Sequence, residues 1–193
     1  MTEAARFKES VRRLHAEKDT AYGSAWKRRG ELISVLANIA RKVDRLEQAA
    51  AGAPATRDES VLDTAVDLLV YSLKYQTYLA DQDGEVAISL FGVATGPFSD
   101  GRGGFEALLD ALDLRMLDDE WSAPGVGEAG TAVIAAFSEL EMCFATGAVA
   151  SPAPERWNRA VALTRAAGQT VAALRRESPI LFDDFLRVWK RDV

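Results

Sequence analysis

Apolar residues recur at helical spacing along most of this 193-residue chain. In residues 3–19, Phe7, Val11 and Leu14 follow an i, i+4, i+7 pattern, which is typical of one buried helix face. Residues 85–93 are the exception, because so short an apolar run fits either a strand or the start of a helix. The expected helices cover residues 3–19, 25–50, 58–80, 105–121, 131–146, 155–177 and 179–190. The pattern therefore predicts an all-α protein, a helical bundle of six or seven helices.

Turn-forming residues separate these segments. Gly23 interrupts the first pair of helices, since glycine accepts the positive φ that often follows a helix. Glycine-rich stretches at 95–104 and 122–130 predict loops, and Ser178-Pro179 predicts the start of the last helix. The sequence GRGG at 101–104 lacks the Lys-Ser/Thr of a phosphate-binding P-loop, which favours a plain flexible loop there.

Composition narrows the chemistry. The chain has one cysteine, Cys143, and one histidine, His15, which excludes an internal disulfide framework and a Cys-based zinc cluster and disfavours a Ser-His-Asp triad. We expect His15, near the end of a helix, to be solvated or to cap that helix, and Cys143 to be buried packing. If the protein is an enzyme, its chemistry must therefore depend on carboxylates, Lys, Arg and Tyr.

The charge distribution bears on partners and location. The first 84 residues carry equal numbers of basic and acidic side chains, so the formal net charge of −6 falls on residues 85–193. A pI near 4.9 argues against binding to duplex nucleic acid, which requires a basic face. No apolar run is long enough to cross a membrane, and the charged N-terminus has no apolar signal region. We expect a cytoplasmic protein with no membrane partner.

Three acids on the expected third helix form the most informative cluster. Glu59, Asp63 and Asp67 are spaced i, i+4, i+8 and share one helix face. Asp63 and Asp67 lie within an apolar run, VLDTAVDLLVYSL, where ionised carboxylates require a compensating cation. That cation is either a basic side chain of the preceding helix (Arg41, Lys42 or Arg45) or a hard divalent metal, Mg²⁺ or Mn²⁺. Spacing alone leaves both interpretations open.

Three sequence blocks, in order, carry a resemblance to a known family. They are EKDTAYGSAW (17–26), IARKVDRL (39–46) and DTAVDLLVY (63–71). Their order and spacing resemble the nucleotide modification associated domain family, which is similar in turn to the MazG-like all-α nucleoside triphosphate pyrophosphohydrolases. The resemblance covers roughly residues 15–80.

The resemblance implies a Mg²⁺-dependent hydrolase that splits a canonical or modified (deoxy)nucleoside triphosphate and releases pyrophosphate. It implies that Asp63 and Asp67 are catalytic and that they bind the metal, with Glu59 as a further candidate ligand. It also implies that the nucleotide is contacted by Lys18, Tyr22, Lys42, Arg45 and Tyr71.

One departure from the MazG-like pattern keeps a second interpretation open. The expected second helix carries Glu31, Asp44 and Glu47, which do not form the E-x-x-E pair usual in those enzymes. The sequence therefore favours an enzyme of this class, and the alternative is a non-catalytic nucleotide-binding or protein-interaction module. In the alternative, Asp63 and Asp67 form salt bridges with basic residues of the second helix.

The resemblance also suggests a division of the chain. We expect residues 1–83 to form a MazG-like, nucleotide-binding helical core. Residues 84–193 would be an acidic helical extension that packs on this core or mediates self-association. Because MazG-like sites are often completed between subunits, a homo-oligomer is the expectation by analogy.

Overall fold

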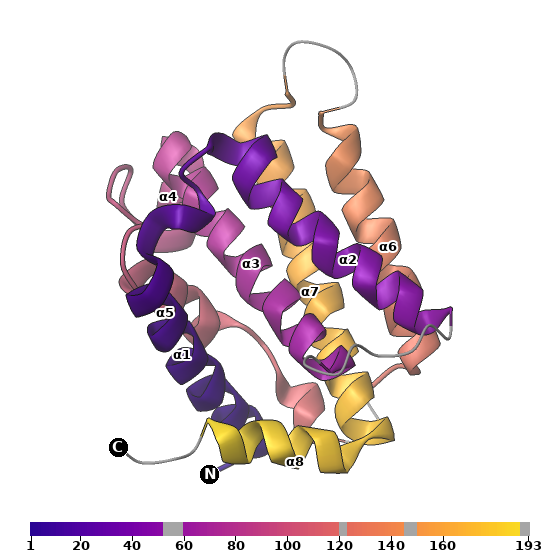
Figure 1. The fold of residues 1–193 in the computed structure, drawn as a ribbon. Coiled ribbons are helices and arrows are strands. Elements are labelled where there is room, and N and C mark those ends of the chain that lie inside the picture. The colour runs from indigo at the N-terminus through magenta and orange to yellow at the C-terminus, as the bar shows by residue number, and fades with distance from the viewer. Residues whose placement is uncertain (52–59, 120–122, 145–149, 190–193) are drawn as a thin grey trace.

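The computed structural model describes residues 1–51, 60–119, 123–144 and 150–189, and within these ranges it contains helices and no strand. The all-α prediction is confirmed, with eight α-helices in the described ranges instead of six or seven (Figure 1). These helices are α1 (Glu3–Tyr22), α2 (Ala37–Ala50), α3 (Val61–Gln82), α4 (Gly84–Phe91), α5 (Gly103–Ala111), α6 (Val126–Met142), α7 (Ala153–Glu177) and α8 (Pro179–Val188).

The third helix, α3, is the centre of the bundle (Figure 1). It contacts α1, α2, α4, α5 and α8, and it packs most extensively against α7. Its apolar residues point in every direction, as expected of a helix that neighbours cover on all sides. No helix in the described ranges is both long and apolar enough to cross a membrane.

The two ends of the chain are joined through α1 and α8. The ring of Phe7 stacks on Phe182 at a centroid distance of 5.7 Å and lies 5.8 Å from Phe185. All three rings are buried in the same core as α3. Glu3 adds an ion pair of 2.6 Å to Arg175 on α7. The N-terminal helix is therefore fixed by the C-terminal helices as well as by its sequence neighbours.

The single helix predicted over residues 25–50 is interrupted. A short 3₁₀ turn, η1 (Gly23–Trp26), is followed by a turn that ends at Gly30, and a π-helical segment, η2 (Glu31–Leu36), then leads into α2. Gly30 has φ of +83°, which is outside the helical region and suits glycine best. The apolar periodicity does not report this break, because the buried residues on either side of it still face the core.

The helix predicted over residues 105–121 ends early, at Ala111. Leu112 is extended, and the chain then forms a 3₁₀ turn, η3 (Arg115–Leu117). Leu114 and Leu117 are nevertheless buried. Leu114 packs against α7 beside Gly168, where an added Cβ would lie 3.2 Å from the leucine side chain. Packing on α7 therefore determines the path of this segment.

Two further boundaries differ from the sequence prediction. Most of the ambiguous residues 85–93 belong to α4, which ends at Phe91. Asp83 caps this helix by accepting hydrogen bonds from the backbone N–H groups of Glu85 and Val86 at 2.9 and 3.1 Å. Helix α6 begins at Val126, within the stretch 122–130 that was expected to be a loop. The loop predicted from the glycine content is therefore longer than the observed one.

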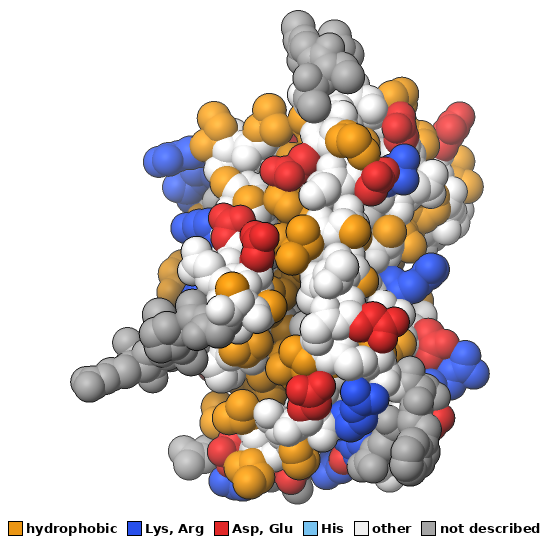
Figure 2. Space-filling view, turned by 90° about the vertical axis from the view of Figure 1, so that its right-hand side faces the viewer, with side chains coloured by type: hydrophobic (Ala, Val, Ile, Leu, Met, Phe, Trp, Pro, Cys, Tyr) orange, Lys and Arg blue, Asp and Glu red, His pale blue; other side chains and the backbone are white. Residues whose placement is uncertain are grey.

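An apolar hollow lies between α2 and α6 (Figure 2). Its volume is about 320 Å³, and the side chain of Leu32, which lines it, is 59% exposed. The hollow is lined by Leu32, Leu36, Ala37, Ala40, Phe137, Glu141 and Phe144. Among the described lining residues, the one charged side chain is the acid Glu141, which makes the hollow a poor site for an anionic ligand.

Candidate functional site

A cavity of about 390 Å³ lies between α1, η1, α2 and α3. Its polar and aromatic lining residues are His15, Lys18 and Tyr22 from α1, Trp26 from η1, Asn38 from α2, and Asp67, Tyr71 and Lys74 from α3. On each of α1 and α3 these residues are three, four or seven positions apart, so they share one helix face. The volume falls within the range typical of small-molecule sites. The first and third resembling sequence blocks thus contribute residues to one pocket, whereas the second block, 39–46, contributes no lining residue.

Asp67 is held by two lysines at this cavity. Its Oδ1 accepts a hydrogen bond from Lys18 at 2.6 Å, and its Oδ2 lies 2.7 Å from the Nζ of Lys42. The carboxylate is buried, and the side chain of Lys42 is only 15% exposed, whereas that of Lys18 is 45% exposed. A buried carboxylate depends on such partners, because its desolvation is costly. The lysines therefore supply the cation that the sequence required.

Asp63 lies one turn before Asp67 but serves a different purpose. Its Oδ2 accepts hydrogen bonds from the backbone N–H and the hydroxyl of Ser60 at 2.9 and 2.8 Å, and its own N–H donates to the Ser60 hydroxyl at 3.1 Å. This reciprocal pair is a capping box at the start of α3. Asp63 does not line the cavity. Glu59, the third predicted acid, lies outside the described residues.

The predicted nucleotide contacts fall into two groups. Lys18, Tyr22 and Tyr71 line the cavity, with Tyr22 at its exposed edge. Burial raises the pKa of the Tyr71 phenol, and the neighbouring Asp67 raises it further, so Tyr71 is a hydrogen-bond donor at neutral pH. Lys42 reaches the site through Asp67. Arg45, which is half-buried on α2, is not among the lining residues.

Lys74 is a feature of the site that sequence reasoning missed. Its Nζ lies 4.6 Å from the centroid of the Trp26 ring, within the range of a cation–π contact. Burial lowers the pKa of Lys74 to about 8; Asp19 opposes this shift, and Lys18 and Lys27 add to it. The only sequence signal is its spacing, since Lys74 lies seven residues after Asp67 and hence on the same helix face.

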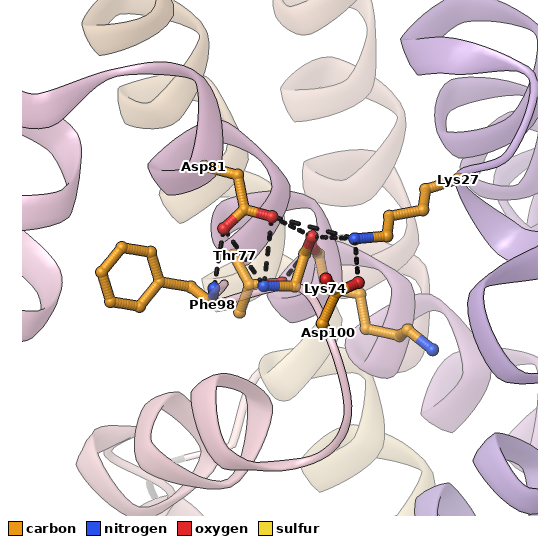
Figure 3. A network of polar contacts seen from close by, with 7 residues as sticks. Lys27, Lys74, Thr77, Asp81, Phe98 and Asp100 are labelled. Carbon is orange, nitrogen blue, oxygen red and sulfur yellow. Dashed lines mark hydrogen bonds and ion pairs between the residues drawn. The ribbon is translucent and has the colours of Figure 1, made fainter. Parts of the chain in front are cut away.

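Lys27, whose positive charge helps to lower the pKa of Lys74, is engaged by other partners (Figure 3). Its Nζ donates to Asp100 at 2.6 Å and to the Ser99 hydroxyl at 2.5 Å, and it lies 3.8 Å from Asp81. Asp81 in turn accepts a hydrogen bond of 2.7 Å from the backbone N–H of Phe98. This cluster ties the loop before α5 to the end of α3. Figure 3 shows the ammonium of Lys74 directed away from it.

The position of His15 corrects the expectation of a solvated or capping side chain. It is 1% exposed and stacks on Phe105 with ring centroids 3.9 Å apart. Neither ring nitrogen has a hydrogen-bond partner in the described part of the chain. Burial lowers the pKa of His15 to about 3, and the positive charges of Lys74 and Arg102 lower it further, so the ring is neutral at physiological pH. His15 lies four residues after Val11, and this spacing could have indicated its burial.

Glu31, an acid of the predicted second helix, belongs to a separate polar network. It accepts a hydrogen bond from the hydroxyl of Tyr75 and forms an ion pair with Arg156. Burial raises the pKa of Tyr75, and the adjacent Glu31 raises it further. The network connects η2, α3 and α7. Glu31 links Tyr75 and Arg156, which indicates a structural function, although the Nε of Arg156 has no hydrogen-bond partner in the described part of the chain.

The carboxylates described at the cavity do not fit a magnesium ion. Mg²⁺ is bound through carboxylates together with waters or substrate phosphates. Asp67 is the one carboxylate lining the cavity, and both of its oxygens are engaged by ammonium groups. Over the described ranges, no three His, Cys, Asp or Glu side chains are grouped as metal ligands would be. Magnesium binding therefore stays a prediction of the family resemblance.

Fold and site together define an all-α protein with a lysine-rich cavity in its N-terminal half. No family model matches the chain, and searches of curated proteins and of solved structures return no significant match. The resemblance to the nucleotide modification associated domain family thus depends on the three sequence blocks alone.

Proposed function

We propose that this protein binds a nucleoside phosphate in the cavity between α1 and α3, and that lysines, not a divalent metal, provide the positive charge. The observation that carries the proposal is the charge balance of the site. Lys18 and Lys42 share the single carboxylate of Asp67, and Lys74 adds a third ammonium group with no ion pair in the described residues. Such a cavity attracts an anion.

The aromatic residues favour a ligand that contains a ring. Tyr22, Trp26 and Tyr71 line the same cavity as the lysines. Aromatic side chains can stack on a nucleobase, and the amide of Asn38 can donate and accept hydrogen bonds at a base edge. Phosphate and base recognition are thus combined in one pocket, which supports a nucleotide over a simple inorganic anion.

The test is a binding and turnover panel on the full chain. Nucleoside mono-, di- and triphosphates, canonical and modified, are added in EDTA and in Mg²⁺, and the melting temperature and pyrophosphate release are measured. A ligand at 100 times its Kd stabilises the folded state by about 2.7 kcal/mol, which raises the melting temperature by roughly 5–10 °C for a chain of this size. We expect this shift in EDTA.

Matched variants separate binding from hydrolysis. Lys18→Met is expected to weaken binding, while Asp63→Asn, which alters only the cap of α3, leaves it unchanged. Magnesium-dependent pyrophosphate release that is lost in Asp67→Asn would establish the hydrolase in place of the binding module. No thermal shift with any nucleotide, in either condition, would refute the proposal.

A further inference from the structure

Two polar groups at the buried end of the cavity have no partner among the described residues. The ammonium of Lys74 rests on Trp26 without an ion pair, and both ring nitrogens of His15 lack a hydrogen bond. Both residues line the same cavity. A buried imidazole nitrogen without a hydrogen bond is unfavourable to the folded protein, and the ammonium of Lys74 has no counter-ion in the described ranges. The two groups together indicate that something polar occupies this end when the protein functions.

The surrounding charges determine which kind of group fits. From α1, Lys18 and Asp19 act on Lys74, and Lys27 after η1 and Arg102 before α5 add positive charge. Lys18 and Lys27 are compensated by other carboxylates. Asp19 favours the charged form of Lys74 but forms no ion pair with it in the described structure. The net field at this end is therefore positive.

The opposite end of the cavity is a less favourable binding site for an anion. There the ammonium groups of Lys18 and Lys42 are already engaged by Asp67, whereas the ammonium of Lys74 has no ion pair among the described residues. The family resemblance would assign phosphate contacts to Lys42 and Arg45, but the charge distribution favours Lys74. A phosphoryl group provides several acceptor oxygens, enough for the ammonium of Lys74 and an N–H of His15 together.

We propose that the space between Lys74 and His15 is the phosphoryl subsite of this protein, where the ligand's phosphate becomes the counter-ion of Lys74. This inference rests on the proposed nucleotide binding and specifies how the ligand is oriented. The base then lies toward Tyr22 and Tyr71, at the more exposed end of the cavity. The imidazole of His15 donates to a phosphate oxygen and stays stacked on Phe105.

The subsite implies that phosphate binding takes up a proton at alkaline pH. With a pKa of about 8, the fraction of Lys74 that is deprotonated is about 0.9 at pH 9 and about 0.1 at pH 7. A dianionic phosphate restores the ammonium form, so binding at pH 9 takes up nearly one proton. His15 is neutral and Tyr71 protonated at pH 9 in the free protein, and the phosphate itself is already a dianion. Lys74 is therefore the group that accepts the proton.

The experiment is isothermal titration calorimetry on the full chain with AMP, inorganic phosphate and adenosine. Titrations at pH 7 and pH 9, each in two buffers of different ionisation enthalpy, give the number of protons taken up. We expect an uptake close to one proton at pH 9 for AMP and phosphate and none for adenosine. Lys74→Met should abolish the uptake and weaken AMP binding at least tenfold.

Two matched variants complete the design. Lys18→Met, which removes a lysine already paired with Asp67, should keep a smaller proton uptake, because Lys18 no longer lowers the pKa of Lys74. His15→Phe should weaken AMP binding and keep the uptake. AMP binding without proton uptake at pH 9 would overturn the subsite while the proposed function stands. Equal affinity for adenosine and AMP would overturn both, because the lysines would then not bind the phosphate. If no nucleotide and no phosphate binds the wild-type chain, both proposals fall.

Discussion

Charged side chains around the cavity differ in how far their neighbours compensate them. Asp67 has two ammonium partners, and Lys27 has two carboxylates and a hydroxyl. Within the described ranges, Lys74 has an aromatic ring and no ion pair. A paired charge stabilises the fold, whereas an unpaired one is available to a ligand. Substitutions at these residues should therefore separate into effects on stability and effects on binding.

Removing Lys42 should destabilise the protein more than removing Lys18. Lys42→Met leaves one oxygen of the buried Asp67 without its partner, and we expect the free energy of unfolding in urea to fall by about 1–3 kcal/mol. Lys18→Met is the control, with an expected loss below about 1 kcal/mol, because that lysine is largely solvated. Equal losses in the two variants would contradict this assignment.

His15 should make the stability of the protein depend on pH. Its pKa is about 3 in the folded protein and about 6.5 in an unfolded chain, so between these values the unfolded state binds the extra proton. The free energy of unfolding should therefore fall as the pH decreases from about 6.5 toward 3, by up to about 1.4 kcal/mol per pH unit from this group.

The measurement is urea unfolding of the wild-type chain and of His15→Phe between pH 5 and pH 7. Phenylalanine keeps a ring against Phe105 but does not titrate. The variant should become progressively more stable than the wild type on acidification. Two parallel stability curves would mean that His15 does not remain neutral and buried.

At the scale of elements, the cavity exists because helices end or break beside it. The turn at Gly23–Trp26 and the break at Gly30 place Trp26 over Lys74, which a continuous helix over 25–50 would not do. On the other side, the loop before α5 is fixed to Asp81 at the end of α3 (Figure 3). Irregular segments thus position the site, and regular helices supply most of its side chains.

A pair of neighbouring glycines tests the contact between this loop and α5. A Cβ added at Gly104 would lie 2.1 Å from the carbonyl oxygen of Phe98, whereas one added at Gly103 would have nothing within 4 Å. Gly104→Ala should lower the free energy of unfolding by about 1–3 kcal/mol, because backbone must move. Gly103→Ala should be within about 1 kcal/mol of wild type and is expected to stabilise. Similar urea midpoints for both variants would contradict the close approach.

At the scale of the whole molecule, the N-terminal and C-terminal parts share one hydrophobic core. Helix α3 packs most extensively on α7, and the network of Glu31, Tyr75 and Arg156 links the two parts through hydrogen bonds and an ion pair. The part that carries the cavity is thus supported by residues beyond 83. The excess negative charge of residues 85–193 lies on that supporting part.

Residues 1–83 expressed alone should not unfold cooperatively. Without α7 and α8, the surfaces of α3 and Phe7 that they cover would be exposed to water, which removes much of the hydrophobic stabilisation of the fragment. Thermal unfolding followed by circular dichroism should show a gradual change for the fragment and a single sharp transition for the full chain. A sharp transition in the fragment would show that the first 83 residues are an independent domain.

The helices, their approximate order and most buried positions followed from the sequence, because helical periodicity is a local property that a window of residues reveals. Phe7, Val11 and Leu14 were expected on a buried helix face and are buried in the core. The position of Asp67 next to a lysine of the preceding helix was also one of the two alternatives that the sequence allowed. Helix ends were less well predicted, since glycine and apolar spacing do not distinguish a loop from a turn packed on a neighbour.

The separation of Asp63 from Asp67 and the burial of His15 and Lys74 were decided by the tertiary structure. Asp63 and Asp67 share a helix face. Asp63 bonds to Ser60 at the start of its own helix, whereas Asp67 pairs with lysines of two other helices. Whether a charge is compensated depends on residues distant in sequence, and the field at Lys74 is the sum of several such residues. Sequence by itself determined which elements form, because that depends on local spacing; the packing of those elements determined which side chains meet, because electrostatic and hydrogen-bond partners act through space.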